Sequence, residues 1–277
     1  GRGGVVVTHV QLLTEQAASS QSLHKPLELY IFIDPLCTSA VDMQAIVRKL
    51  QVQYEQYFTC RFILSTKLAS LNCLEEKTKG CMSGQDVDVK HPVLPSVAVK
   101  AAELQGKRAG LRFLTKLQEC LMLKQKNLQS YNTLLEIAEQ SQLDMQEFRN
   151  DFGSKEAAHA FQCDLHITNE MDVSELPTIV FFNECIEDEG LKVSGLYTYE
   201  VYEHILSEML NAPLIPNQPP PVEELLGRFH SLSTQEIAAM YNLTEAAAER
   251  EMKKRMLQQK VERTQANDVT LWRLKHA

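Results

Sequence analysis

One cysteine of this chain stands where a thiol could do chemistry. Residues 27–40 read LELYIFIDPLCTSA, an apolar strand followed by an Asp-Pro turn and then Cys37 at the start of a helix. A helix N-terminus favours the thiolate, which is the nucleophilic form of cysteine. Dithiol exchange also needs a second sulfur to release the mixed disulfide, and the last position of the C-x-x-C pattern is here Ala40. We therefore predict no dithiol redox cycle and interpret Cys37 as a vestigial redox position, with monothiol sensing or glutathionylation as the alternative.

The other candidate chemistry is metal binding. His159, Cys163 and His166 follow one another at helical spacing, which could present three zinc ligands on one helical face. Because the sequence places no fourth ligand beside them, we predict no metal site. Glycine-rich phosphate loops, paired-carboxylate motifs and Ser-His nucleophile signatures are also absent from the sequence. We expect a protein without catalytic residues and without a cofactor.

Cys37 must be positioned by the elements on either side of it. In residues 27–33 both faces are apolar, which predicts a strand in the centre of a sheet. A helix is expected from Ser39 to about Phe58, followed by a second strand over 60–64. A strand, helix and strand in this order imply a parallel pair with a right-handed crossover.

The middle of the chain has helical rather than strand periodicity. Apolar residues recur three and four apart, and Asp144 and Ser154 are typical helix N-caps. The expected helices are Val97–Leu104, Leu111–Leu123, Tyr131–Gln140, one opened by Asp144 and one running from Ser154 toward Thr168. We therefore expect a helical insertion at about 95–170 that interrupts the sheet.

The sheet is expected to resume at residues 176–182, LPTIVFF, where a proline enters an apolar strand. Proline cannot donate to the ladder, so it belongs at a strand start or in a cis bond. Because Pro177 stands at the head of an apolar strand opposite the cysteine helix, we predict that it is cis and that its loop structures the surface beside Cys37. A cysteine and a proline loop in this arrangement are typical of thioredoxin-like folds, in which the proline loop pairs with an extended substrate backbone. Such a surface can bind a partner by strand addition without any chemistry.

Prolines mark the best domain boundary. A strand is expected over 190–197 and a helix over 199–210, and the following APLIPNQPPP can form neither helix nor ladder. The predicted division is a flexible arm over 1–24, a thioredoxin-like domain over 25–211, a proline-rich linker over 212–221 and a small domain over 222–277.

The C-terminal segment predicts a winged helix-turn-helix. A helix over 222–230 precedes a capping box at 233–236, and Thr244 starts a third helix. Residues 260–264 and 268–274 form a plausible hairpin. Three helices and a hairpin are the elements of a winged helix-turn-helix domain.

Charge argues against nucleic acid as a partner. Residues 222–277 hold nine Lys or Arg and eight Asp or Glu, a net charge of +1. The third helix starts with Glu245 and Glu249, where a DNA-reading helix would meet base edges and phosphates. We expect Lys253, Lys254 and Arg255 to form a basic cluster at its far end, and Trp272 to pack against the helices.

Four segments resemble the YjbH family, also called SpxH, of cytosolic adapters that present the transcription factor Spx to the ClpXP protease. They are KPLELYIFIDPLC (25–37), AAELQGKRAGLRFLTKLQE (101–119), AFQCDLHITNEMDVSELPTIVFFN (160–183) and YEVYEHILSEML (199–210). The resemblance implies an α/β, DsbA-like thioredoxin fold with a helical insertion and no enzymatic turnover. Many members keep the C-x-x-C pair that is broken here, and some have a zinc-linked His- and Cys-rich N-terminal segment, where this chain has only His9 and His24.

The leading hypothesis is a non-catalytic adapter that binds Spx and promotes its degradation by ClpXP. Its partner surface is predicted to include Asp34, Leu36, Cys37, Glu175, Leu176 and Pro177. A DsbA-like thiol oxidoreductase or isomerase is the first alternative, which the broken C-x-x-C pair disfavours. A DNA-binding regulator is the second, which the acidic third helix disfavours.

Composition indicates the compartment. The formal net charge of −8 argues against an acidic membrane surface as partner, and no apolar run reaches the length of a bilayer span. Seven scattered cysteines in a chain of 277 residues favour reduced thiols over a disulfide framework. We expect a cytoplasmic protein that binds neither nucleic acid nor membrane.

Overall fold

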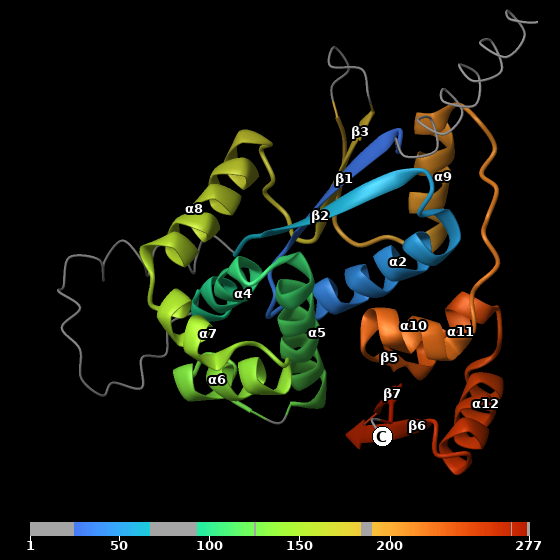
Figure 1. Ribbon diagram of the computed structural model, residues 1–277. Helices are drawn as coiled ribbons and strands as arrows, with labels where there is room; N and C mark the ends of the chain where they lie inside the picture. Colours follow the sequence, from blue (N-terminus) through green and yellow to red (C-terminus); the bar gives the residue numbers. More distant parts are fainter. Residues whose placement is uncertain (1–24, 67–92, 125, 184–189, 267, 276–277) are drawn as a thin grey trace, which may run out of the picture.

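The computed structural model describes residues 25–66, 93–124, 126–183, 190–266 and 268–275 (Figure 1). The predicted arm over 1–24 lies outside these residues. The described chain forms a mixed α/β structure with two sheets, one of four strands and one of three. The mixed α/β class predicted from the sequence is therefore confirmed.

The larger sheet has the strand order β2-β1-β3-β4, with β1 in its interior. Its strands are β1 (Leu27–Ile33), β2 (Phe58–Leu64), β3 (Thr178–Asn183) and β4 (Leu191–Ser194). Strands β1 and β2 are parallel and are joined through α2 (Thr38–Tyr54), whereas β3 pairs antiparallel with both β1 and β4. The predicted central strand and parallel pair are thus confirmed, and the predicted strand over 190–197 is shorter, because Gly195 leaves the ladder with a φ of +91°.

Among the described residues, five helices form the predicted insertion between β2 and β3. They are α4 (Leu94–Leu104), α5 (Lys107–Leu123), α6 (Tyr131–Gln140), α7 (Met145–Phe152) and α8 (Lys155–Glu170). The Asp144 carboxylate accepts hydrogen bonds from two backbone N–H groups at the start of α7, and the Ser154 hydroxyl accepts one at the start of α8. The insertion shares one hydrophobic core with the sheet, to which Phe113 and Phe148 contribute with ring centroids 5.5 Å apart.

A buried ion pair fastens the insertion to the sheet. Lys100 of α4 lies 2.6 Å from the Asp164 carboxylate of α8, and both side chains are buried. The same carboxylate accepts a hydrogen bond of 2.8 Å from the backbone N–H of Leu64, the last residue of β2. The end of the second strand and two helices of the insertion therefore meet at one charged pair.

The C-terminal unit, residues 222–275, contains the predicted three helices and hairpin. Its elements are α10 (Val222–Phe229), β5 (Leu232–Ser233), α11 (Thr234–Tyr241), α12 (Glu245–Leu257), β6 (Val261–Ala266) and β7 (Val269–Leu274). The capping box of Ser233 and Glu236 is present, and Trp272 is fully buried with its indole N–H 2.9 Å from the Thr234 hydroxyl. The two-residue strand β5, which pairs with β7, was not predicted.

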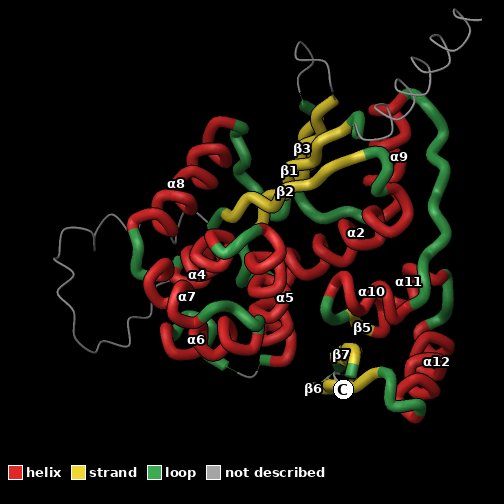
Figure 2. The backbone as a smooth tube through the Cα atoms, in the orientation of Figure 1, coloured by secondary structure: helices red, strands yellow, loops and turns green. Residues whose placement is uncertain are grey.

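The proline-rich segment runs as an irregular extended chain from α9 (Tyr199–Leu210) to α10 (Figure 2). It is fastened along the way, because the Asn217 backbone N–H donates to the Gln53 carbonyl at 2.8 Å and Gln56 donates to the Ile215 carbonyl at 2.9 Å. The spacer therefore lies on the end of α2. The division into separate domains stays a proposal.

The C-terminal unit packs on helices α2 and α5 through both polar and apolar contacts. Arg48 of α2 lies 2.9 Å from the Glu236 carboxylate of α11, and Arg273 of β7 lies 2.6 Å from Glu119 of α5. Val52 of α2 belongs to the hydrophobic cluster of the C-terminal unit. The two units thus share an interface that the sequence did not predict.

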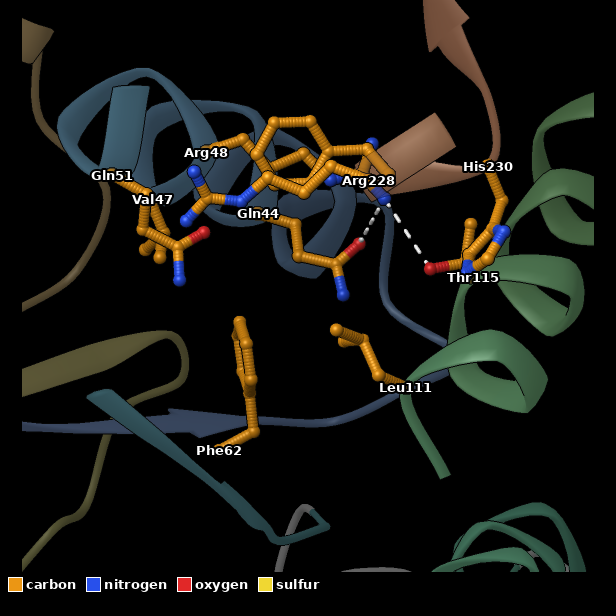
Figure 3. A pocket seen from close by; sticks show the side chains of 10 residues that line it. Gln44, Val47, Arg48, Gln51, Phe62, Leu111, Thr115, Arg228 and His230 are labelled. Atoms are coloured by element: carbon orange, nitrogen blue, oxygen red, sulfur yellow. Dashed lines mark hydrogen bonds between the residues drawn. The ribbon is translucent and has the colours of Figure 1, made fainter. Parts of the chain in front are cut away.

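Figure 3 shows the small pocket inside this interface, where Arg48, Gln44 and Thr115 converge. The Arg48 guanidinium donates to the Gln44 and Thr115 side-chain oxygens at 3.4 Å. His230 also lines the pocket, and burial together with the cations Arg112 and Arg48 lowers the pKa of its imidazole. The pocket is therefore a polar part of the interface.

Candidate functional site

Two chain segments named as partner-binding candidates meet at one edge of the larger sheet. Strand β1 runs toward this edge and β3 runs away from it, with Phe32 paired to Thr178. Residues 34–37 follow the end of β1, and residues 175–177 precede the start of β3. The antiparallel register therefore brings the two candidate segments to the same edge.

A tight turn delivers Cys37 to the N-terminus of α2. The Asp34 carboxylate accepts from the Leu36 backbone N–H at 3.0 Å, and the Cys37 backbone N–H donates to the Asp34 carbonyl at 3.0 Å. Cys37 has an extended backbone and is the N-cap residue, with its Sγ 2.9 Å from the Ser39 hydroxyl. The thiol is partly exposed, so it is accessible to solvent.

Among the residues that the structure describes, no second thiol stands beside Cys37. Ala40, at the position where exchange would need one, is 1% exposed and is part of the main core. The other described cysteines, Cys60, Cys120 and Cys163, are also free. Burial raises the pKa of the Cys60 and Cys120 thiols, which disfavours their reactive thiolate forms. Nothing in the described part of the chain supplies a resolving sulfur to Cys37.

The proline loop is held in a fixed shape. The bond between Leu176 and Pro177 is cis, which confirms the prediction. The Thr178 hydroxyl donates to the Glu175 carbonyl at 2.7 Å, and the Gly195 backbone N–H donates to the Pro177 carbonyl at 2.8 Å. Gly195 is required here, because its φ is +91° and an added Cβ would lie 3.1 Å from a Glu175 carboxylate oxygen.

Two residues of this edge were not predicted from the sequence. Leu196 and Tyr197 follow Gly195 and are 40% and 50% exposed. The buried Tyr202 hydroxyl fixes their segment by accepting from the Tyr197 backbone N–H at 3.1 Å and donating to the Gly195 carbonyl at 3.2 Å. The sequence did contain a signal for these two residues, because Leu196 and Tyr197 form an apolar pair between Gly195 and the helix cap Thr198.

We name the resulting area the edge surface. It consists of Asp34, Leu36, Cys37, Glu175, Leu176, Pro177, Leu196 and Tyr197. Pro177 is buried and Glu175 is exposed, while Asp34, Leu36, Cys37 and Leu176 are partly exposed. Exposed apolar side chains on a fixed backbone, beside the two carboxylates of Asp34 and Glu175, suit recognition of another polypeptide.

The candidate zinc ligands do not converge. His159 lies 3.7 Å from the Cys163 sulfur, whereas His166 pairs with Glu170 at 3.2 Å. Within the described ranges, no group of three or more His, Cys, Asp or Glu side chains is placed to hold a metal ion.

Lys253, Lys254 and Arg255, predicted as a basic cluster at the far end of the third helix, lie toward the C-terminal end of α12, and each of them is paired with an acid. Lys253 pairs with Glu249 at 2.8 Å and Lys254 with Glu251 at 2.7 Å. Hydrogen bonds from these lysines lower the pKa of both glutamates. Arg255 is likewise paired, with Glu223 and Glu251. Acidic neighbours one turn away on α12, together with Glu223 of α10, therefore neutralise the cations.

Comparisons with known proteins agree with this architecture. A family model described as Thioredoxin matches residues 30–204. The chain is 41% identical over 267 residues to the ClpXP adapter protein SpxH of Bacillus subtilis, covering 90% of this chain and 89% of the relative. It is 40% identical over 278 residues to the protein of the same name from Halalkalibacterium halodurans, covering 91% and 90%.

Solved structures show the same fold at low identity. A putative protein disulfide isomerase from Nitrosomonas europaea matches with a TM-score of 0.51 and 15% identity, over 68% of this chain and 97% of that one. A probable DsbA oxidoreductase from Streptomyces coelicolor matches with a TM-score of 0.50 and 12% identity, over 67% and 90%. The fold is therefore thioredoxin-like and DsbA-like. No helix in the described ranges is long and apolar enough to cross a membrane.

Proposed function

This chain belongs to the SpxH family of ClpXP adapter proteins, and we propose that it binds the transcription factor Spx and promotes degradation of Spx by the ClpXP protease. The observation that supports this most directly is the 41% identity to the Bacillus subtilis adapter across 90% of the chain. That similarity extends beyond the thioredoxin-like part, which ends near residue 204. The adapter acts in the cytoplasm and without enzymatic turnover.

The edge surface is the proposed contact with the client. An adapter must hold its client without modifying it, so a binding surface is needed and a reaction centre is not. Leu196 and Tyr197 offer exposed apolar area on a backbone that the buried Tyr202 hydroxyl holds in place. Burying such side chains on binding contributes most of the affinity of a typical protein interface.

Thiol oxidoreductase activity is the second candidate, because the fold neighbours include disulfide oxidoreductases. Cys37 stands at the helix N-terminus that such chemistry needs. The buried Ala40 side chain argues against it, because a mixed disulfide on Cys37 would have no neighbouring thiol to resolve it.

Degradation of Spx by purified ClpXP, with and without the full chain, tests the proposal. We expect faster loss of Spx when the chain is present. The double substitution of Leu196→Asp and Tyr197→Asp should weaken Spx binding by about tenfold or more, which is about 1.4 kcal/mol or more. The control is Leu257→Asp, since Leu257 is 79% exposed at the far end of α12.

Equal rates of Spx degradation with and without the chain would refute the adapter function. Equal Spx binding by the wild-type chain and the double variant would refute the edge surface alone. Insulin reduction by the wild-type chain at the rate of a C-x-x-C enzyme, lost in Cys37→Ser, would favour the oxidoreductase instead.

A further inference from the structure

A groove of about 950 Å³ runs between the thioredoxin-like part and the C-terminal unit. Helix α2 and the start of α9 form one wall, and α11, the start of α12 and the β6–β7 hairpin form the other. Thr38, the residue after Cys37, is part of the lining. The groove therefore lies close to the edge surface.

The groove is strongly acidic. Among the residues that the structure describes, the lining includes one cation, Lys49, and six carboxylates. The carboxylates belong to Asp42, Glu200, Glu236, Glu245, Glu249 and Asp268. Lys49 lies 3.9 Å from the centre of the Tyr199 ring, so its charge is held against one wall. The whole chain has 36 Asp and Glu against 28 Lys and Arg, so the excess of carboxylates over cations in the groove is much greater than in the chain as a whole.

Four of these six carboxylates form no ion pair with a residue that the structure describes. Glu236 pairs with Arg48, Glu249 pairs with Lys253, and Glu200 bonds to the helix cap. Asp42, Glu245 and Asp268 form no ion pair with any residue that the structure describes, and all three are exposed to solvent. Partial burial raises the pKa of the Asp42 carboxyl. Unpaired carboxylates that line one groove favour the approach of positive charge.

Apolar side chains complete the lining. They are Val41, Ala45, Ile46, Met122, Tyr199, Ala239, Ala246 and Val269. Five of them, from α2, α5, α9 and β7, are large enough to pack against an apolar stretch of a ligand. An occupant that matches the groove therefore combines positive charge with apolar side chains.

The walls are held in position by buried contacts. Arg48 reaches across from α2 to the Glu236 carboxylate at 2.9 Å and toward the Ser231 carbonyl at 3.4 Å. Arg273 of β7 reaches Glu119 of α5 at 2.6 Å. The groove thus lies between units that are fastened to each other, and a ligand need not first bring the walls together.

We infer that this groove binds a cationic, partly apolar segment of the client protein, with Lys or Arg side chains opposite Asp42, Glu245 and Asp268. The inference rests on the proposed adapter function and specifies its partner. Small-molecule pockets have volumes of about 300–1,000 Å³ and are mostly apolar with a few converging polar groups. Here the carboxylates are spread over five elements, which suits an extended polypeptide segment. Nucleic acid and anionic lipid are excluded by the sign of the charge.

The test combines two reversals of charge in the full chain, Asp42→Lys with Glu245→Lys. The matched control is Glu139→Lys with Glu156→Lys. Glu156, like Glu245, is an acid in the first turn of a helix, and Glu139, like Asp42, is an exposed acid of a helix. Two readouts are taken, isothermal titration with Spx and fluorescence anisotropy with a labelled peptide of alternating Arg and Leu residues.

We expect the reversed variant to bind both Spx and the peptide about tenfold more weakly, which corresponds to about 1.4 kcal/mol. The control should bind both as the wild type does, and added salt should weaken wild-type binding more than that of the reversed variant. A circular dichroism spectrum like that of the wild type shows that the reversed variant is folded.

Each other outcome has a defined meaning. Unchanged binding of both ligands by the reversed variant overturns the inference. Loss of peptide binding with unchanged Spx binding leaves a cationic-peptide groove and overturns its role in client binding. If the wild-type chain binds the peptide but not Spx, the proposed adapter function has failed while the groove chemistry stands.

Discussion

Replacing Arg48 by Met tests whether one buried ion pair holds the C-terminal unit against α2. The Arg48 and Glu236 side chains are 11% and 10% exposed, and their charged atoms lie 2.9 Å apart. Methionine retains most of the apolar stem of arginine and removes the guanidinium, together with its weaker hydrogen bonds to Gln44, Thr115 and the Ser231 carbonyl. The substitution therefore leaves the Glu236 carboxylate at the interface without its cation.

The expected cost follows from what Glu236 retains. Removing one partner of a fully buried pair costs about 3–5 kcal/mol. Glu236 keeps the hydrogen bond from the Ser233 backbone N–H at 2.8 Å and is not completely enclosed, so we expect a loss of about 2–3 kcal/mol. Some of the cost is offset because the arginine no longer has to be desolvated.

The single tryptophan makes the assay specific. Trp272 is fully buried in the C-terminal unit, so its fluorescence reports that unit during urea unfolding. Far-ultraviolet circular dichroism reports the whole chain. We expect Arg48→Met to shift the fluorescence transition to lower urea more than the circular dichroism transition.

Arg108→Met is the control, since Arg108 is exposed and has no ion partner among the residues described. A double-mutant cycle with Glu236→Gln should give a coupling of about 1–3 kcal/mol between the two side chains. A fluorescence midpoint for Arg48→Met equal to that of Arg108→Met would refute the reasoning, because it would mean that the pair contributes nothing to the docking of the two units.

Three further predictions concern stability, pH and the thiol. Asp164→Asn should lower the free energy of unfolding by about 3 kcal/mol, as measured by urea unfolding. The reason is that the buried Lys100 ammonium would lose the Asp164 carboxylate and, among the described residues, would keep Glu103 as its ion partner. Because the pKa of His230 is lowered in the folded chain, the unfolded chain binds the proton more readily, and the free energy of unfolding should fall as the pH falls below about 6.5. The substitution His230→Asn should make that free energy less dependent on pH, which thermal unfolding at a series of pH values measures. Cys37→Ser should leave ClpXP-dependent loss of Spx unchanged, and a large decrease would show that the thiol itself takes part.

Local patterns in the sequence determined most elements of this protein. Asp144 and Ser154 cap helices because their side-chain oxygens reach N–H groups only two or three residues away. The apolar faces of residues 27–33 required burial on both sides, which only an interior strand provides. The broken pair of Cys37 and Ala40 needed no coordinates at all, because chemistry that requires two sulfurs is excluded by residue type.

Contacts between residues far apart in the chain were decided by the tertiary structure alone. Arg48 and Glu236 are 188 residues apart. Neither the helical periodicity nor the capping residues of the sequence indicate which buried cation pairs with which carboxylate. The short strand β5 forms only because β7 offers it a partner. The acidic groove likewise exists because the two units pack with Asp42 and Glu245 on facing walls. Sequence patterns report the interactions within one element, whereas the docking of elements depends on side chains that meet only after the chain has folded.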